Sequence, residues 1–100
     1  MKTGIGCDMR GLLSFQVLWL VSRKPMHGDE IANELGKRRG GKPKAGTIYP
    51  ALKDLKNRKL IKGVKKGKII TYTLTAEGKK TVKHAKEYFQ RCFGEILEGN

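Results

Sequence analysis

The feature that most constrains the fold of this chain is the segment 45–61, AGTIYPALKDLKNRKLI. Ile48, Leu52 and Leu55 are spaced i, i+4, i+7, which predicts a helix with one apolar face. The other side carries polar and aromatic residues: Thr47, Tyr49, Lys53, Lys56 and Asn57. One face for a core and one such polar face suit a DNA groove, although a solvated lysine face would have the same pattern.

We expect this helix to begin at Gly46 or Thr47, where the Thr47 hydroxyl can accept a free N–H of the first turn. Pro50 then falls within that first turn, where its missing N–H costs little. The N-terminal end also offers free N–H groups and a positive dipole end to a phosphate.

Basic residues are concentrated around this helix. The chain has 22 Lys and Arg against nine Asp and Glu, a formal charge of +13, and nearly all of that charge lies between Gly36 and Lys68, where Asp54 is the one acid. Such a field indicates a polyanionic partner, most often nucleic acid and sometimes an anionic membrane surface. A lysine-rich surface can also serve solubility or stability at high temperature.

Several other classes of protein are disfavoured. Cys7 and Cys92 are far apart and suit reduced thiols, with a dimer-linking or redox role as the alternative. The apolar run 12–21 is too short to span a bilayer, and we expect a cytoplasmic protein without a membrane partner. The chain offers no ligand-spaced His/Cys pair, no nucleophile with a base and no GxxxxGK[ST] motif, so we expect no metal, no cofactor and no enzymatic activity.

Two helices are predicted before the basic segment. Asp8 can cap a helix running to about Ser22, and this helix is apolar over most of its circumference and should be central to the core. Its inward residues are expected to be Leu13, Val17, Leu20 and Val21. Residues 26–28 read as a connector, in which His27 has a structural hydrogen-bonding role rather than a ligand role.

The second helix should open at Gly28 or Asp29 and stop at Gly36. Ile31, Ala32 and Leu35 are its inward residues. A flexible basic loop, 36–44, then leads to the segment 45–61.

After Lys59 the hydrophobic period changes from that of a helix to that of strands. Leu60–Val64 reads as a short strand, residues 65–68 as a turn, and residues 69–75 as a second strand with Ile70, Tyr72 and Leu74 on one face. Helices followed by a basic hairpin make a winged helix-turn-helix over residues 8–75, in a mainly α fold with a small β-hairpin. The residues expected to bind DNA are Lys44, Thr47, Tyr49, Pro50, Lys53, Lys56, Lys65, Lys66 and Lys68.

A last helix, capped by Thr75, is predicted from Ala76 to about Glu98. Its apolar residues are spaced 3-4-3-4, which is a heptad seam. The residues expected at a dimer interface are Val82, Ala85, Phe89, Cys92, Phe93, Ile96 and Leu97. We therefore interpret 76–98 as a dimerisation helix, with packing back on its own domain as the alternative.

At four places the sequence resembles the PadR family of transcriptional regulators. The segments are 25–31 (PMHGDEI), 46–52 (GTIYPAL), 60–61 (LI) and 72–78 (YTLTAEG), and the similarity covers about 12–80. The resemblance implies a homodimeric winged-helix repressor that binds double-stranded DNA. It places Thr47, Tyr49 and Pro50 at the start of the recognition helix and Lys65–Lys68 on the wing.

Two residues depart from the family pattern. Asp29 stands where the family usually has an aromatic ring after His-Gly, and Lys59 stands where a Gly usually precedes Leu-Ile. The helix end near Lys59 must then close without the residue that most easily adopts a left-handed conformation. Some members of the family bind aromatic effectors between subunits. The aromatic residues that could line such a site, or simply pack, are Phe15, Trp19, Phe89 and Phe93.

The leading functional hypothesis is a sequence-specific DNA-binding repressor. The alternative is a winged-helix module that binds RNA or DNA without sequence preference.

Overall fold

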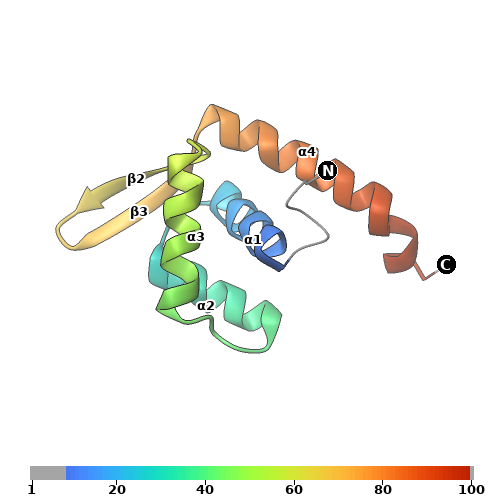
Figure 1. Cartoon of the computed structure of the whole chain (residues 1–100), viewed down its shortest axis with the longest axis horizontal. Helices are drawn as coiled ribbons and strands as arrows, with labels where there is room; N and C mark the ends of the chain where they lie inside the picture. Colours follow the sequence, from blue (N-terminus) through green and yellow to red (C-terminus); the bar gives the residue numbers. More distant parts are fainter. Residues whose placement is uncertain (1–8, 100) are drawn as a thin grey trace.

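The computed structural model describes residues 9–99, which form four helices and one small sheet (Figure 1). The elements are α1 (Met9–Arg23), β1 (Met26–His27), α2 (Gly28–Arg39), α3 (Ala45–Asn57), β2 (Ile61–Lys66), β3 (Ile69–Leu74) and α4 (Ala76–Leu97). The order of helices and hairpin is that of the expected winged helix-turn-helix. Cys7 and the expected cap Asp8 lie outside the described residues.

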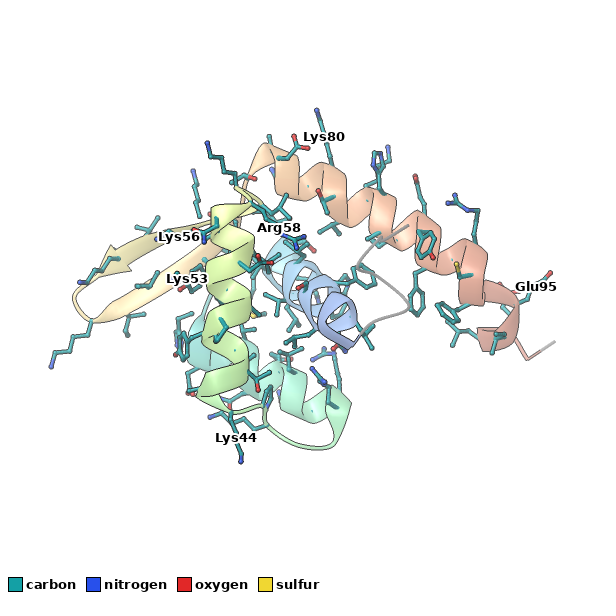
Figure 2. The ribbon with its side chains drawn as sticks, viewed as in Figure 1. Lys44, Lys53, Lys56, Arg58, Lys80 and Glu95 are labelled. Atoms are coloured by element: carbon teal, nitrogen blue, oxygen red, sulfur yellow. The ribbon has the colours of Figure 1, made fainter. Side chains whose placement is uncertain are left out.

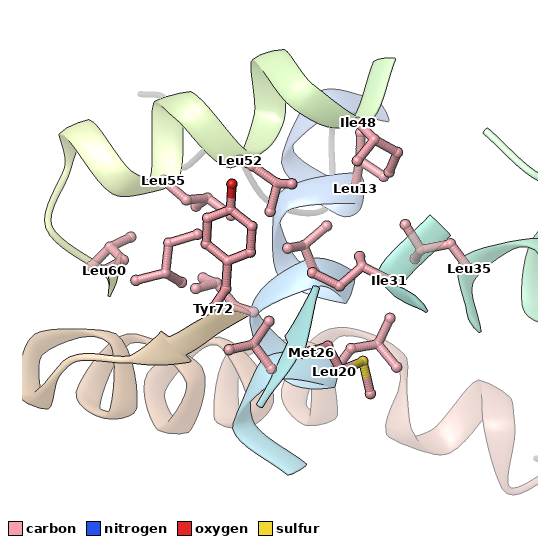
Figure 3. Close-up of a cluster of buried hydrophobic side chains, with 14 of the residues drawn as sticks. Leu13, Leu20, Met26, Ile31, Leu35, Ile48, Leu52, Leu55, Leu60 and Tyr72 are labelled. Carbon is pink, nitrogen blue, oxygen red and sulfur yellow. The ribbon is translucent and has the colours of Figure 1, made fainter. Parts of the chain in front are cut away.

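Helix α1 is the centre of the core, as its apolar circumference predicts, and it contacts α2, α3 and α4. Its four expected inward residues are all buried, and Leu18 is buried as well. The expected faces of α2 and α3 are also confirmed, because Ile31, Leu35 and Leu52 lie at or below 1% exposure. Figure 3 shows these side chains pointing toward one another between the helices and β3. The core thus fixes which face of α3 stays outside.

Residues 26–28 form more than the expected connector. Met26 pairs with Tyr72 and His27 with Thr71, so β1 is an antiparallel edge strand in a sheet of order β1-β3-β2. His27 then caps α2: its Nδ1 accepts the Glu30 N–H (3.4 Å), and Glu30 Oε1 accepts the His27 N–H (3.0 Å). This reciprocal capping box confirms the structural role expected for His27.

Helix α2 runs one turn further than predicted. Gly36 lies inside the helix, and Gly40 closes it with φ 80° and an N–H donated to the Gly36 carbonyl. The added turn is held by Lys37 and Arg38, which both bind the Glu34 carboxylate (3.0 and 2.9 Å). These hydrogen bonds, with Arg38 the larger cause, lower the pKa of Glu34 to about 2.

The start of α3 differs from the expectation. The helix begins at Ala45, and the Lys44 carbonyl accepts the N–H groups of Thr47 (2.8 Å) and Ile48 (3.0 Å). The cap position has no side-chain hydrogen bond, so Thr47 is not the cap. Pro50 is consequently the sixth helical residue, and it deprives the exposed Gly46 carbonyl of its usual partner.

The end of α3 closes in a Schellman motif on a lysine. Leu60 N–H donates to the Leu55 carbonyl (3.0 Å) and Lys59 N–H to the Lys56 carbonyl (2.9 Å). Lys59 has φ 64°, the one positive φ at a non-glycine residue between 9 and 99. Buried Leu55 and Leu60 provide the hydrophobic contact that accompanies this motif. The helix therefore ends with the geometry that usually requires glycine, and Lys59 adopts that strained backbone conformation instead.

The Leu-Thr-Ala-Glu-Gly stretch joins the end of α3 to the start of α4. Thr75 Oγ1 donates to the Lys59 carbonyl (2.6 Å) and accepts the Gly78 N–H (3.0 Å), so Thr75 caps α4 as predicted. A Cβ at Gly78 would collide with the Leu60 carbonyl oxygen. Glycine is required here because the first turn of α4 packs directly on the backbone after α3.

The turn of the hairpin is tighter than predicted. Lys65 and Lys66 belong to β2, and the turn is the pair Gly67–Lys68, with Gly67 at φ 62°. Glycine with positive φ at the first position is typical of a two-residue hairpin turn. Figure 1 shows this hairpin extending from the body beside α3.

Helix α4 packs across α1, and this corrects part of the expected dimer seam. Val82 and Ala85 are buried at 6% and 5% exposure by their own chain, and Val82 belongs to the core cluster. The winged-helix core therefore extends past residue 75 into the first half of α4. The remaining seam residues lie further along the helix, where Figure 1 shows α4 running beyond the other elements.

Candidate nucleic-acid interface

The outer face of α3 presents every residue that the sequence assigns to it. Thr47, Tyr49, Pro50, Lys53 and Lys56 are exposed, whereas the opposite face is buried. Figure 2 shows Lys44 at the N-terminal end of the helix and Lys53 and Lys56 on its outer surface. The arrangement gives one helix side chains for hydrogen bonds and positive charge along a single accessible side.

The N-terminal end of α3 has backbone donors to spare. The first N–H groups in the helical ladder are those of Thr47 and Ile48, which leaves the N–H groups of Ala45 and Gly46 outside it. Lys44 supplies no side-chain cap, so these donors are not used by the cap residue. The Lys44 side chain lies at the same exposed end of the helix. Such an end favours an anionic oxygen.

The Tyr49 ring occupies the space that a side chain at position 28 would need. A Cβ there would lie 2.9 Å from Tyr49 Cε1 and 2.9 Å from its hydroxyl oxygen. The ring therefore packs against the start of α2, although 51% of Tyr49 stays exposed. Burial, with a smaller contribution from Tyr49, raises the pKa of neighbouring Tyr72. The His-Gly stretch thus leaves room for the aromatic residue on the outer face of α3.

A recess of about 480 Å³ lies between α2, the start of α3 and the loop that joins these two helices. Its polar residues include Asp29 and Lys42, whose carboxylate and ammonium are 2.9 Å apart. This ion pair, mainly through its hydrogen bond, lowers the pKa of Asp29. Asp29 therefore places a carboxylate in a recess that Tyr49 also lines. Neither Asp29 nor Lys42 was predicted to belong to the site, since a pair separated by 13 residues leaves no local pattern.

A second recess of about 270 Å³ connects α3 to the wing. Its walls come from His27 and the start of α2, from Tyr49, from the turn residue Lys68 and from β3, including Ile70. Two predicted DNA-binding residues far apart in the sequence, Tyr49 and Lys68, thus line one hollow. The outer face of α3 and the hairpin therefore meet at this recess.

The wing has apolar as well as basic residues on its exposed face. Val64 pairs with Thr71 and Lys66 with Ile69, so these side chains share one face of the hairpin. Val64 and Ile69 are 53% and 52% exposed. Neither was predicted as a site residue, because β-branched residues in a strand were read only as support for the fold. Beside Lys66, the side chains of Val64 and Ile69 can contact the sugars between the phosphates of a nucleic-acid strand.

The aromatic residues of α1 and α4 separate into two groups. The ring centroids of Phe15 and Phe89 are 6.0 Å apart, and those of Phe89 and Phe93 are 4.8 Å apart. Trp19 instead lies against the guanidinium groups of Arg23 and Arg38. Phe89 and Phe93 are partly buried, whereas Cys92, Ile96 and Leu97 are exposed.

Two properties belong to residues 9–99 as a whole. This part of the chain gathers no group of three or more His, Cys, Asp or Glu side chains around a point where a metal ion could bind. Its helices are also too short or too polar to cross a membrane.

Comparison with known proteins gives a consistent result. Residues 17–84 match the model of the transcriptional regulator PadR-like family. A PadR-like transcriptional regulator from Bacillus cereus is 25% identical, with a TM-score of 0.77 over 92% of this chain and 97% of that one. RosR from H. salinarum is 26% identical, with a TM-score of 0.76 over 82% and 76% of the two chains.

A putative transcriptional regulator from Thermoplasma acidophilum is 25% identical, with a TM-score of 0.74 over 90% of this chain and 91% of that one. No curated protein matches the sequence. The family match covers more than half of the chain and coincides with the winged-helix core and its exposed basic helix. The chain therefore belongs to the PadR-like family and is a DNA-binding transcription regulator rather than an enzyme.

Proposed function

We propose that this regulator is a cytoplasmic homodimeric repressor that inserts α3 into the major groove and lays the wing, Lys65–Lys68, on the adjacent backbone. The single observation that carries this proposal is the division of α3 into two faces. One face packs on the core through Ile48, Leu52 and Leu55. The other face exposes Tyr49 and Lys53, with the basic hairpin beside them. Side chains on such a face read base edges, and the wing lysines fix the register on the phosphates.

The dimer is supported by the far end of α4. Ile96 and Leu97 are 67% and 70% exposed, and they follow Phe93 and Cys92 on the part of the helix that extends beyond the domain. Large exposed apolar side chains that cluster on one helix end suit a second copy of the chain. A two-fold dimer places two α3 helices about 34 Å apart and requires a palindromic operator.

The test is a comparison of affinities for promoter DNA and random duplex over a salt series. For a repressor we expect a large affinity ratio and a slope of log affinity against log salt of roughly −5 to −9, from six to ten phosphate contacts per dimer. Similar affinities for both duplexes would support the alternative, a module without sequence preference. Deletion of the gene should raise transcription from the bound promoters, and a fall would identify an activator.

A further inference from the structure

Helix α4 carries a second basic surface that the recognition helix and wing do not include. Lys79, Lys83 and Lys86 are spaced i, i+4, i+7, so they lie along one flank of the helix, and all three are exposed. We call these three residues the α4 lysine stripe. It occupies the first half of α4, before the aromatic residues Phe89 and Phe93 and the exposed Ile96 and Leu97.

The stripe is unfavourable for the helix that carries it. Lys79 and Lys83, and Lys83 and Lys86, are neighbours of like charge on the helix surface. Within residues 9–99 none of the three side chains makes an ion pair or a hydrogen bond. The last turn of α4, where positive charge would stabilise the helix dipole, has no basic residue. Helix stability therefore does not explain this placement of charge.

The stripe begins where the candidate DNA interface ends. Gly78, one residue before Lys79, packs on the Leu60 carbonyl directly after the Schellman motif of α3. Figure 2 shows Lys80, beside the stripe, pointing away from the domain. The stripe therefore starts beside the C-terminal end of α3 and extends away from it along α4.

From these observations we propose that the α4 lysine stripe binds the DNA backbone outside the operator half-site read by α3, and so lengthens the bound segment; this rests on the proposed function. Lys79 and Lys86 are seven residues apart, about 10 Å along the helix, which is about the axial length of three base pairs of duplex. A protein partner fits less well. Lysine is depleted in protein interfaces, and in the described chain the large exposed apolar side chains lie elsewhere.

The test uses the full chain, its promoter operator, and two duplexes of about 20 and 40 bp centred on that operator. The wild type should bind the long duplex about tenfold more tightly than the short one, with a steeper salt slope. Combined substitution of Lys79→Gln, Lys83→Gln and Lys86→Gln should abolish this difference and change affinity for the short duplex less than about twofold. The thermal midpoint should be equal to or above that of the wild type, because repulsion is relieved.

A charge-matched variant, Lys24→Gln, Arg39→Gln and Arg91→Gln, removes three exposed positive charges that form no ion pair within the described chain, and it should keep the length dependence. An unchanged ratio of long to short affinity in the stripe variant would overturn the proposal. So would loss of repression in cells with full affinity for the long duplex, which would assign the stripe to an acidic protein partner. Failure of the wild type to prefer the operator over random 20-bp duplex would instead contradict the proposed function.

Discussion

Lys59 is the residue at which this chain accepts backbone strain. Its φ of 64° lies in the left-handed region, which costs a residue with a Cβ about 1–2 kcal/mol. Its N–H and that of Leu60 close α3, and its carbonyl accepts the Thr75 hydroxyl. The conformation is therefore imposed by two helices that meet at this point.

Lys59→Gly should stabilise the protein by up to about 1 kcal/mol, since glycine removes the steric cost but loses more entropy on folding. The measurement is the free energy of unfolding in urea. Lys56→Gly is the matched control: it removes the same charge within the helix and should destabilise by about 1 kcal/mol. A destabilised Lys59→Gly variant would mean that the side chain contributes more than its backbone conformation costs.

Gly28 and Tyr49 act as a pair at the residue scale. A methyl group at position 28 would contact the Tyr49 ring at 2.9 Å, and the ring, as the end of a flexible side chain, must turn away. Gly28→Ala should leave stability nearly unchanged and weaken operator binding by an amount similar to that of Tyr49→Ala, about 1–3 kcal/mol.

The double variant tests this link. If Gly28 acts only by positioning Tyr49, Gly28→Ala should have little further effect on operator affinity in a Tyr49→Ala background. Fluorescence anisotropy with labelled operator measures all four proteins. Additive losses would show that the two residues contribute independently.

At the scale of elements, the sequence predicted the helices and the hairpin, but not strand β1, the end of α2 or the start of α3. The faces of α1, α2 and α3 follow from apolar spacing, and the structure confirms them. Strand β1 was missed because two residues have no period, and its pairing partners lie 44 or more residues further along the chain. Gly36 did not end α2 because Lys37 and Arg38 hold the next turn through Glu34. These contacts cannot be read from the identity of a single residue.

The sequence likewise predicted some features of the candidate interface and not others. Periodicity located Lys53 and Lys56 on the outer face of α3, and the charge count located the wing lysines. The recesses, the Asp29–Lys42 pair and the contact between Tyr49 and Gly28 depend on how α2, α3 and β3 pack together. Sequence spacing within one element carries no information on such contacts.

The wing is expected to act as an electrostatic element. Lys65, Lys66 and Lys68 are exposed, and none forms an ion pair within the described chain. Combined substitution of all three by glutamine should weaken operator and random duplex about equally and reduce the magnitude of the salt slope by roughly one for each phosphate that is no longer neutralised. An effect confined to the operator would show that the wing reads bases. Lys53→Ala, on α3, is the comparison: this substitution should weaken binding to the operator more than binding to random duplex.

At the scale of the whole molecule, the two halves of α4 differ in what they contact. Its first half completes the core through Val82 and Ala85, and its second half carries apolar side chains beyond the domain. This division decides which substitution tests assembly. Phe89→Lys would also disturb the contact with Phe15, and so it cannot separate folding from dimerisation.

Ile96→Lys is the cleaner test, because Ile96 is 67% exposed in the single chain and its replacement should not change the core. In a dimer it would bury like charges in an apolar seam, and the variant should sediment as a monomer with an unchanged thermal midpoint of the domain at low protein concentration. Glu95→Gln makes the same change in net charge at the preceding residue and should remain dimeric.

Loss of the dimer should also abolish most specific binding, since a monomer holds only one half-site. Cys92, on the same exposed end, gives an independent check: oxidation should link two chains if their Cα atoms come within about 7 Å. The cross-link should form in the wild type and be absent in Ile96→Lys. A wild-type chain that sediments as a monomer at micromolar concentration and still binds its operator tightly would contradict the homodimer, and α4 would then serve the core and the flanking DNA alone.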